Sequence, residues 1–180
     1  MTEPVVFRSR FGIVLTLVMW TLAAAGAISA IAIGWPPVAP CAFVTLGWLV
    51  WLMYWRPCVI AYDAAVELHN VLRDIVIPYG AIDAVDTRFA LTVTVGDDRY
   101  RAWALPAPSS GQARGIRDAS PGERPGDAPS TLVGAAAQLL RREAAAPGAH
   151  GGAPIVRWRL DLCGVTAALV VACIVLALVS

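Results

Sequence analysis

Three long blocks without a charged side chain constrain this chain more than any other feature. They occupy about residues 11–33, 38–55 and 162–180 in a sequence that is 58% hydrophobic. A helix rises about 1.5 Å per residue, and the hydrocarbon core of a bilayer is about 30 Å thick, so blocks of this length suit membrane spans. The first block is too long for the apolar part of a signal peptide. We therefore expect three transmembrane helices that stay in the protein.

The first two blocks form a predicted helical hairpin. The turn between them is Gly34–Pro37, where two consecutive prolines prevent the first helix from continuing. Because arginine is enriched in the cytoplasmic flanks of membrane spans, we expect a multi-pass protein of the inner (plasma) membrane. Its N-terminus and residues 56–159 lie in the cytoplasm, and its C-terminus lies outside. The arginines that flank the blocks all fall on that one side: Arg8, Arg10, Arg56, Arg157 and Arg159.

The segment between the second and third blocks has the alternation of β-strands and then of a helix. Residues 57–106 predict a small cytoplasmic domain of five or so antiparallel strands, with Gly96–Asp98 as a hairpin turn. Residues 107–129 are rich in Pro, Gly and Ser and predict a flexible linker. Ser130 is the expected N-cap of an amphipathic helix at residues 130–146. This helix either closes the β-domain or lies on the membrane.

The remaining parts complete the predicted organisation. Residues 1–56 hold the N-terminal segment and the transmembrane hairpin, and residues 147–161 form a juxtamembrane segment before the last span. The fold class is therefore α + β: an N-terminal transmembrane hairpin, a small antiparallel β-domain, and a C-terminal transmembrane helix.

Three short motifs carry a resemblance to a known family. They are Asn70–Arg73 (NVLR), Ile77–Ile82 (IPYGAI) and Ala102–Pro106 (AWALP). In this order, after a membrane hairpin, they resemble the actinobacterial PH-domain-containing membrane proteins related to the low-molecular-weight protein antigen 6 group. The resemblance covers about Pro4 to Pro108, and it implies a pleckstrin-homology-like (PH-like) fold, a bent β-sheet capped by a C-terminal helix. This sequence departs from the family in the long linker before its candidate capping helix.

Composition argues against an enzyme, a cofactor and a metal site. The sequence has no CxxC motif, no Cys/His cluster and no phosphate-binding loop, and its spans carry no ionisable relay. Of the four cysteines, Cys58 and Cys163 are expected near the inner face, Cys173 within the third span and Cys41 near the outer face. We therefore expect no disulfide. The net charge of +1 does not favour a nucleic-acid partner.

Two arginines in the β-domain are the candidate lipid or partner contacts, Arg73 and Arg88. Recognition of a phosphate headgroup needs several basic side chains on one face. Residues 58–105 contain four arginines and seven acids, a net charge of −3, which disfavours an anionic membrane surface. The remaining singled-out side chains, Tyr79, Trp103 and His69, are interpreted as core or packing residues.

Small residues at four-residue spacing predict helix-packing faces in the first and third spans. Such faces allow two helices to approach closely. They either pack the three spans together or bind another membrane protein. The residues are Gly26, Ala30 and Gly34 in and after the first span, and Gly164, Ala168 and Ala172 in the third.

Two functions from different classes follow from these observations. In the first, the chain is a non-catalytic membrane protein whose cytoplasmic module binds another protein or organises a complex, by association with a partner or with itself. In the second, the module is a sensor that binds anionic lipid headgroups at the membrane surface. Membrane lipids surround the three spans in both.

Overall fold

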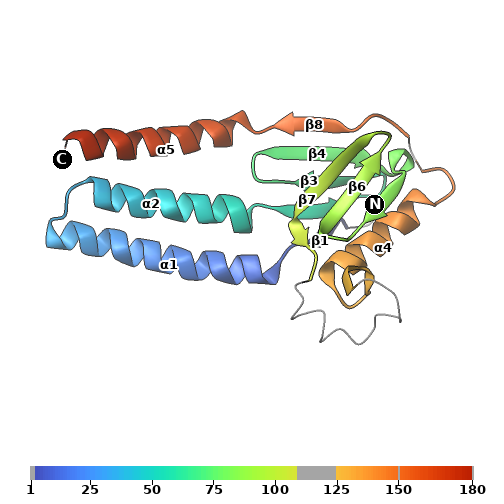
Figure 1. Ribbon diagram of the computed structural model, residues 1–180, viewed down its shortest axis with the longest axis horizontal. Coiled ribbons are helices and arrows are strands. Elements are labelled where there is room, and N and C mark those ends of the chain that lie inside the picture. Colours follow the sequence, from blue (N-terminus) through green and yellow to red (C-terminus); the bar gives the residue numbers. More distant parts are fainter. Residues whose placement is uncertain (1–2, 109–124, 150, 180) are drawn as a thin grey trace. The chain divides into compact units, whose positions relative to one another are not determined.

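The computed structural model describes residues 3–108, 125–149 and 151–179. The chain divides into two compact units. The β-unit comprises residues 1–9 and 57–157, and the helical unit comprises residues 10–56 and 158–180. The class is α + β with antiparallel sheets, as predicted (Figure 1).

The β-unit contains two sheets. Its elements are β1 (Val5–Phe7), β2 (Cys58–Ala61), β3 (Ala65–His69), β4 (Arg73–Pro78), β5 (Ala84–Asp86), β6 (Ala90–Val95), β7 (Asp98–Pro106), α4 (Leu132–Ala144) and β8 (Ile155–Trp158). One sheet has the strand order β1-β2-β3-β4-β8, and the other has the order β5-β6-β7. The pairs β1–β2, β2–β3, β3–β4, β5–β6 and β6–β7 are all antiparallel.

Residues 57–106 form the predicted meander, with six strands where five or so were expected. Gly96 adopts φ +57° in the turn between β6 and β7, a left-handed conformation that suits glycine. Two further strands come from segments that were predicted to lie outside the domain. β1 belongs to the N-terminal segment and β8 to the juxtamembrane segment. These strands have only three and four residues, which is too short for alternation to reveal them.

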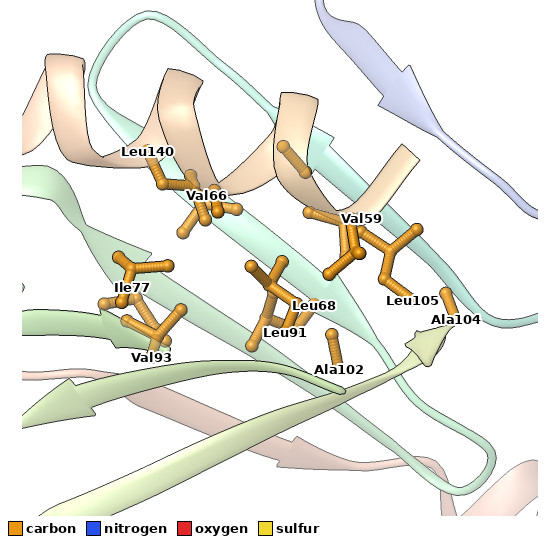
Figure 2. Close-up of a cluster of buried hydrophobic side chains, with 14 of the residues drawn as sticks. Val59, Val66, Leu68, Ile77, Leu91, Val93, Ala102, Ala104, Leu105 and Leu140 are labelled. Carbon is orange, nitrogen blue, oxygen red and sulfur yellow. The ribbon is translucent and has the colours of Figure 1, made fainter. Parts of the chain in front are cut away.

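The core lies between the two sheets and α4. Alternate residues such as Val66 and Leu68 of β3 point inward, and α4 adds Val133, Ala136, Ala137 and Leu140 to the same cluster. Figure 2 shows Leu140 pointing toward this cluster from α4. The helix therefore closes the β-domain, which decides between the two alternatives that the sequence left open.

The start of α4 differs from the prediction in its capping residue. Thr131, not Ser130, is the N-cap, and its Oγ1 accepts a hydrogen bond from the N–H of Gly134 at 3.0 Å. Of the predicted linker, residues 109–124 lie outside the described residues. Its described C-terminal end is part of the fold, because residues 125–127 form a 3₁₀ turn and Ala128 is buried.

The helical unit contains a helix at each of the three predicted spans. They are α1 (Arg10–Ile33), α2 (Val38–Val50) continued by a π-helical turn (Trp51–Trp55), and α5 (Leu160–Val179). All three helices are long and apolar enough to cross a membrane. α2 contacts both α1 and α5 and lies between them (Figure 1). Gly34 adopts φ +76° in the turn from α1 to α2, so this residue serves the turn.

Candidate functional site

The outer side of β7 carries a row of exposed side chains, Arg99, Arg101 and Trp103, which we call the β7 face. Successive residues of a strand point to opposite sides, so the intervening Ala102 and Ala104 are buried in the core. Trp103 is 54% exposed. The prediction that Trp103 is a core residue was therefore wrong, because strand alternation places its two alanine neighbours inside.

Asn70 holds the β7 face in place. Its Nδ2 donates to the carbonyl oxygen of Arg101 at 2.9 Å, and its Oδ1 accepts from the N–H of Trp103 at 2.7 Å. These bonds occur where β7 departs from regular pairing with β6, between the pairs Thr92–Arg101 and Ala90–Pro106. Asn70 follows β3 in the other sheet and is only 7% exposed. One buried side chain thus fastens the two sheets to each other beneath Trp103.

The edge of the three-stranded sheet at β5 is covered by α4. Arg141 of α4 donates from Nη2 to the carbonyl oxygen of Val85 at 2.8 Å and to Asp127 Oδ1 at 2.8 Å. An uncovered strand edge is a site where another strand can add. Because Arg141 occupies this carbonyl, the β7 face is the better candidate for contact with a partner.

The two arginines singled out from the sequence lie on different sheets. Arg73 begins β4 in the five-stranded sheet and is half-buried. Arg88 is exposed in the connection from β5 to β6, and its guanidinium carbon lies 5.0 Å from the centre of the Phe89 ring. The structure thus places these two residues apart in the topology. A role for either in contact with a ligand stays a prediction.

Tyr79 in the IPYGAI motif has a structural role, as predicted. Its side chain is buried, and its hydroxyl donates to the carbonyl oxygen of Tyr62 at 3.0 Å. Burial raises the pKa of Tyr79 to about 12, with smaller contributions from the carboxylates of Glu143 and Asp63. The phenol is therefore protonated at neutral pH and acts as a hydrogen-bond donor.

One row of side chains resembles the components of a nucleophilic enzyme. Cys58, His69 and Asp74 lie directly opposite one another on β2, β3 and β4. His69 Nδ1 is 3.5 Å from Asp74 Oδ1, but its Nε2 lies 3.2 Å from a carboxylate oxygen of Glu67. Cys58 is only 3% exposed, so a substrate cannot reach its sulfur. The row does not support catalysis, and the described residues contain no Cys, His, Asp and Glu group suited to a metal ion.

Among the residues that the structure describes, no arginine lines either of two cavities in the β-unit. A cavity of about 360 Å³ lies beside the first turn of α4 and the end of β7, between Thr131 and Pro106. A second, of about 170 Å³, is lined by Tyr62, Tyr79 and the carboxylates of Asp63 and Glu143, among others. A phosphate group is held by cationic side chains. The described lining of neither cavity offers one, and the second cavity is acidic.

Of the predicted packing residues, Gly26 and Ala30 of α1 are packed, whereas Gly34 lies in the following turn and those of α5 are exposed. A Cβ atom on Gly26 would lie 2.5 Å from the ring of Phe43 in α2, and Ala30 is buried. On α5 the residues Gly164, Ala168 and Ala172 are exposed. Of the two alternatives for these residues, packing of the spans of this chain does not agree with the structure, because Thr166 and Cys173, on a different side of α5, face α2. Contact of this small-residue face with another membrane protein stays a prediction.

The contact between α2 and α5 brings two of the four cysteines together, and all four are free thiols in the structure. Cys41 Sγ and Cys173 Sγ lie 3.0 Å apart, although they are far apart in the sequence. The sequence placed Cys173 within its span and Cys41 near the end of another, and so did not bring them together. Helix register, which no short motif encodes, determines which residues of the two helices lie at the same level.

An apolar cavity of about 460 Å³ lies over α2 in the helical unit. It is lined mainly by Trp20, Trp48, Trp51, Phe43 and alanines of α1. Trp20 Nε1 donates to the carbonyl oxygen of Gly47 at 2.9 Å, so the polar end of this indole is satisfied within the unit. The lining is suited to contact with lipid chains.

Comparison of the chain with protein-family models, with curated proteins and with solved structures finds no match. The proposed function therefore depends on the geometry and chemistry of the chain itself.

Proposed function

We propose that this chain is a plasma-membrane protein whose cytoplasmic β-unit is a PH-like module that binds another protein and organises a membrane complex. The observation that carries the proposal is the exposed indole of Trp103 beside Arg101 on β7, a strand that Asn70 holds by two hydrogen bonds. Trp and Arg are enriched among the residues that dominate the energy of protein interfaces. Anchoring in the membrane raises the effective concentration of the module for partners in the same membrane.

The arrangement of the β-unit supports a PH-like assignment. Strands β1 to β7 form two sheets of antiparallel pairs, and α4 follows them in the chain and packs its apolar side into the core between them. A β-sheet core closed by a following helix agrees with the PH-like fold that the family resemblance implies. The long segment before α4 does not prevent the helix from closing the domain.

Chain connectivity supports the cytoplasmic location. β1 leads into α1, the turn after α2 leads into β2, and β8 leads into α5. The three helix ends joined to the β-unit therefore lie on one side of the membrane. They are also the ends flanked by arginines, which favours the cytoplasm for the β-unit and the outside for the C-terminus.

A protein partner is favoured over an anionic membrane surface by the charge of the module. Residues 58–105 have a net charge of −3, and no arginine is among the described residues that line the two cavities above. An anionic leaflet repels such a domain unless its arginines gather on one side. Arg99 and Arg101 do share the β7 face, so a lipid-binding function is the alternative that the test must separate.

Photo-crosslinking tests the proposal. A photoreactive amino acid replaces Trp103 in the full-length protein in its native membranes, and a matched variant carries it at Arg142, which is exposed on α4. We expect a discrete protein adduct at position 103 and little or none at position 142. Adducts with phospholipid alone at position 103 would overturn the proposal in favour of the lipid sensor.

A further inference from the structure

The contact between α2 and α5 has a regular antiparallel register. Cys41 faces Cys173, and seven residues further along each helix, in opposite directions, Trp48 Nε1 donates to Thr166 Oγ1 at 3.0 Å. Seven residues correspond to two helical turns, the repeat of closely packed helix pairs. Two contacts at this spacing fix the register of α2 against α5. The approach of the two sulfurs is therefore part of a continuous helix contact, which we call the seam.

The first turns of the seam hold the two cysteines together. Thr45 Oγ1 lies 3.3 Å from Cys173 Sγ and also donates to the carbonyl oxygen of Cys41 at 2.9 Å. Thr45 is one turn from Cys41 on the same side of α2. Its hydroxyl therefore contacts the sulfur of Cys173 and the backbone of Cys41, one turn away.

The pair lies near the end of the helical unit that has no arginines. Cys41 is three residues from the start of α2, and Cys173 is six residues from the end of α5. At about 1.5 Å per residue these positions are within about 5 to 9 Å of the helix ends. Both side chains are partly exposed and not enclosed in the seam. In the proposed orientation this end faces the outer, oxidising side of the membrane.

We propose that Cys41 and Cys173 form a disulfide that joins the second and third spans, and that the pair takes a disulfide-bearing oxidant from the outer side. This site is separate from the β7 face and goes beyond the proposed interaction function. A bond between the two sulfurs requires their separation to shorten from 3.0 Å to about 2.05 Å.

The chemistry is a thiol–disulfide exchange in two steps. One cysteine, as its thiolate, attacks a sulfur of the oxidant, which forms a mixed disulfide and releases the first thiolate of the oxidant. The second cysteine then attacks the mixed disulfide, which forms the bond between Cys41 and Cys173 and releases the second thiolate. Two electrons pass to the oxidant, and the two protons lost by the cysteines end on its two new thiols.

Counting free thiols in cells tests the proposal on the intact protein. Cells that produce the full chain are quenched with acid, and the denatured protein is labelled with a maleimide polymer that adds a visible mass to each free thiol. The chain has four cysteines. We expect two adducts on the monomer before reduction and four after it. Four adducts before reduction would overturn the proposal.

Two variants test which cysteines are paired. Cys41→Ser should give three adducts before and after reduction, and fewer than three before reduction would show that other cysteines pair. A matched control moves one thiol by a single residue, with Ala172→Cys together with Cys173→Ala. Because Ala172 is exposed on α5, whereas Cys173 is the residue that faces Cys41, this control should give four adducts before reduction.

Two results would contradict the register argument. If the moved-thiol control also loses two adducts, the pairing does not depend on the seam. If the wild-type chain loses adducts only in a covalent dimer, the bond joins two copies and not two spans. The wild-type count needs no substitution, so misfolding of a variant leaves the main test intact.

Discussion

Replacing Asn70 with alanine tests how the two sheets of the β-unit are fastened together. In the wild-type protein this side chain donates to the carbonyl oxygen of Arg101 and accepts from the N–H of Trp103. Asn70→Ala removes both bonds and leaves two backbone groups of β7 without these partners. The smaller side chain introduces no steric clash, so the change in stability reports the loss of these two hydrogen bonds.

The expected cost follows from burial. Asn70 is 7% exposed. A hydrogen bond contributes about 0.5–1.5 kcal/mol net, and a buried polar group left without a partner costs about 1–3 kcal/mol. Water that enters the space left by the amide offsets part of this. We expect the free energy of local opening of β7 at Trp103 to fall by about 2–4 kcal/mol. At about 1.4 kcal/mol per factor of ten, the lower value raises the equilibrium constant for opening by a factor of about 30.

Amide hydrogen exchange of the full-length protein in detergent measures this directly. The N–H of Trp103 is itself a donor to Asn70, so its exchange should accelerate by about 30-fold or more, as local opening becomes easier. Asp97→Ala, in the exposed β6–β7 turn, is the matched control and should leave the exchange of Trp103 nearly unchanged. An unchanged rate for Trp103 in Asn70→Ala would refute the account of how the β7 face is held.

Three further predictions concern other parts of the chain. The pKa of Tyr79 is raised to about 12 by burial, so the stability that its protonated phenol contributes is complete below about pH 10 and is lost as the pH rises toward 12. Denaturation curves of Tyr79→Phe should lack this loss of stability between pH 10 and 12. An identical loss in the variant would contradict the assignment. Gly26→Leu should destabilise the helical unit by about 1–3 kcal/mol, because Phe43 occupies the space that the new side chain needs. The matched Ala172→Leu, on the exposed side of α5, should not. Equal effects in denaturant titrations would contradict the close contact of Gly26 with Phe43. A thiol introduced by Asp97→Cys should react with an impermeant maleimide only after the membrane is opened, and labelling of intact cells would reverse the proposed orientation.

The spans were predictable because their signal is composition over many residues. Each block is uncharged for 18 or more residues, a length that matches the thickness of a bilayer and exceeds what most buried helices of soluble domains need.

The two alanines beside Trp103 show why finer features were missed. The alternation of Ala102 and Ala104 was visible, but the expectation that an aromatic residue belongs in the core was applied to Trp103 against that alternation.

Features that depend on contacts between distant segments were not predictable in this way. The strands β1 and β8 are three and four residues long and acquire their structure from pairing with β2 and β4. The side of α5 that contacts α2 was also missed. Small residues at four-residue spacing suggested one side, while the seam uses Thr166 and Cys173 on another. Register between two helices depends on the packing of every level at once.

Recovery of a partner through Trp103 tests the central claim most directly. The full-length wild-type protein, Trp103→Ala and Asp97→Ala are isolated from native membranes, and the proteins that accompany each are quantified by mass spectrometry. A dominant interface tryptophan contributes about 2 kcal/mol or more. We therefore predict a specific protein recovered equally by the wild type and Asp97→Ala, and reduced about tenfold or more by Trp103→Ala. Equal recovery by all three, or no protein other than the chain itself, would contradict the account.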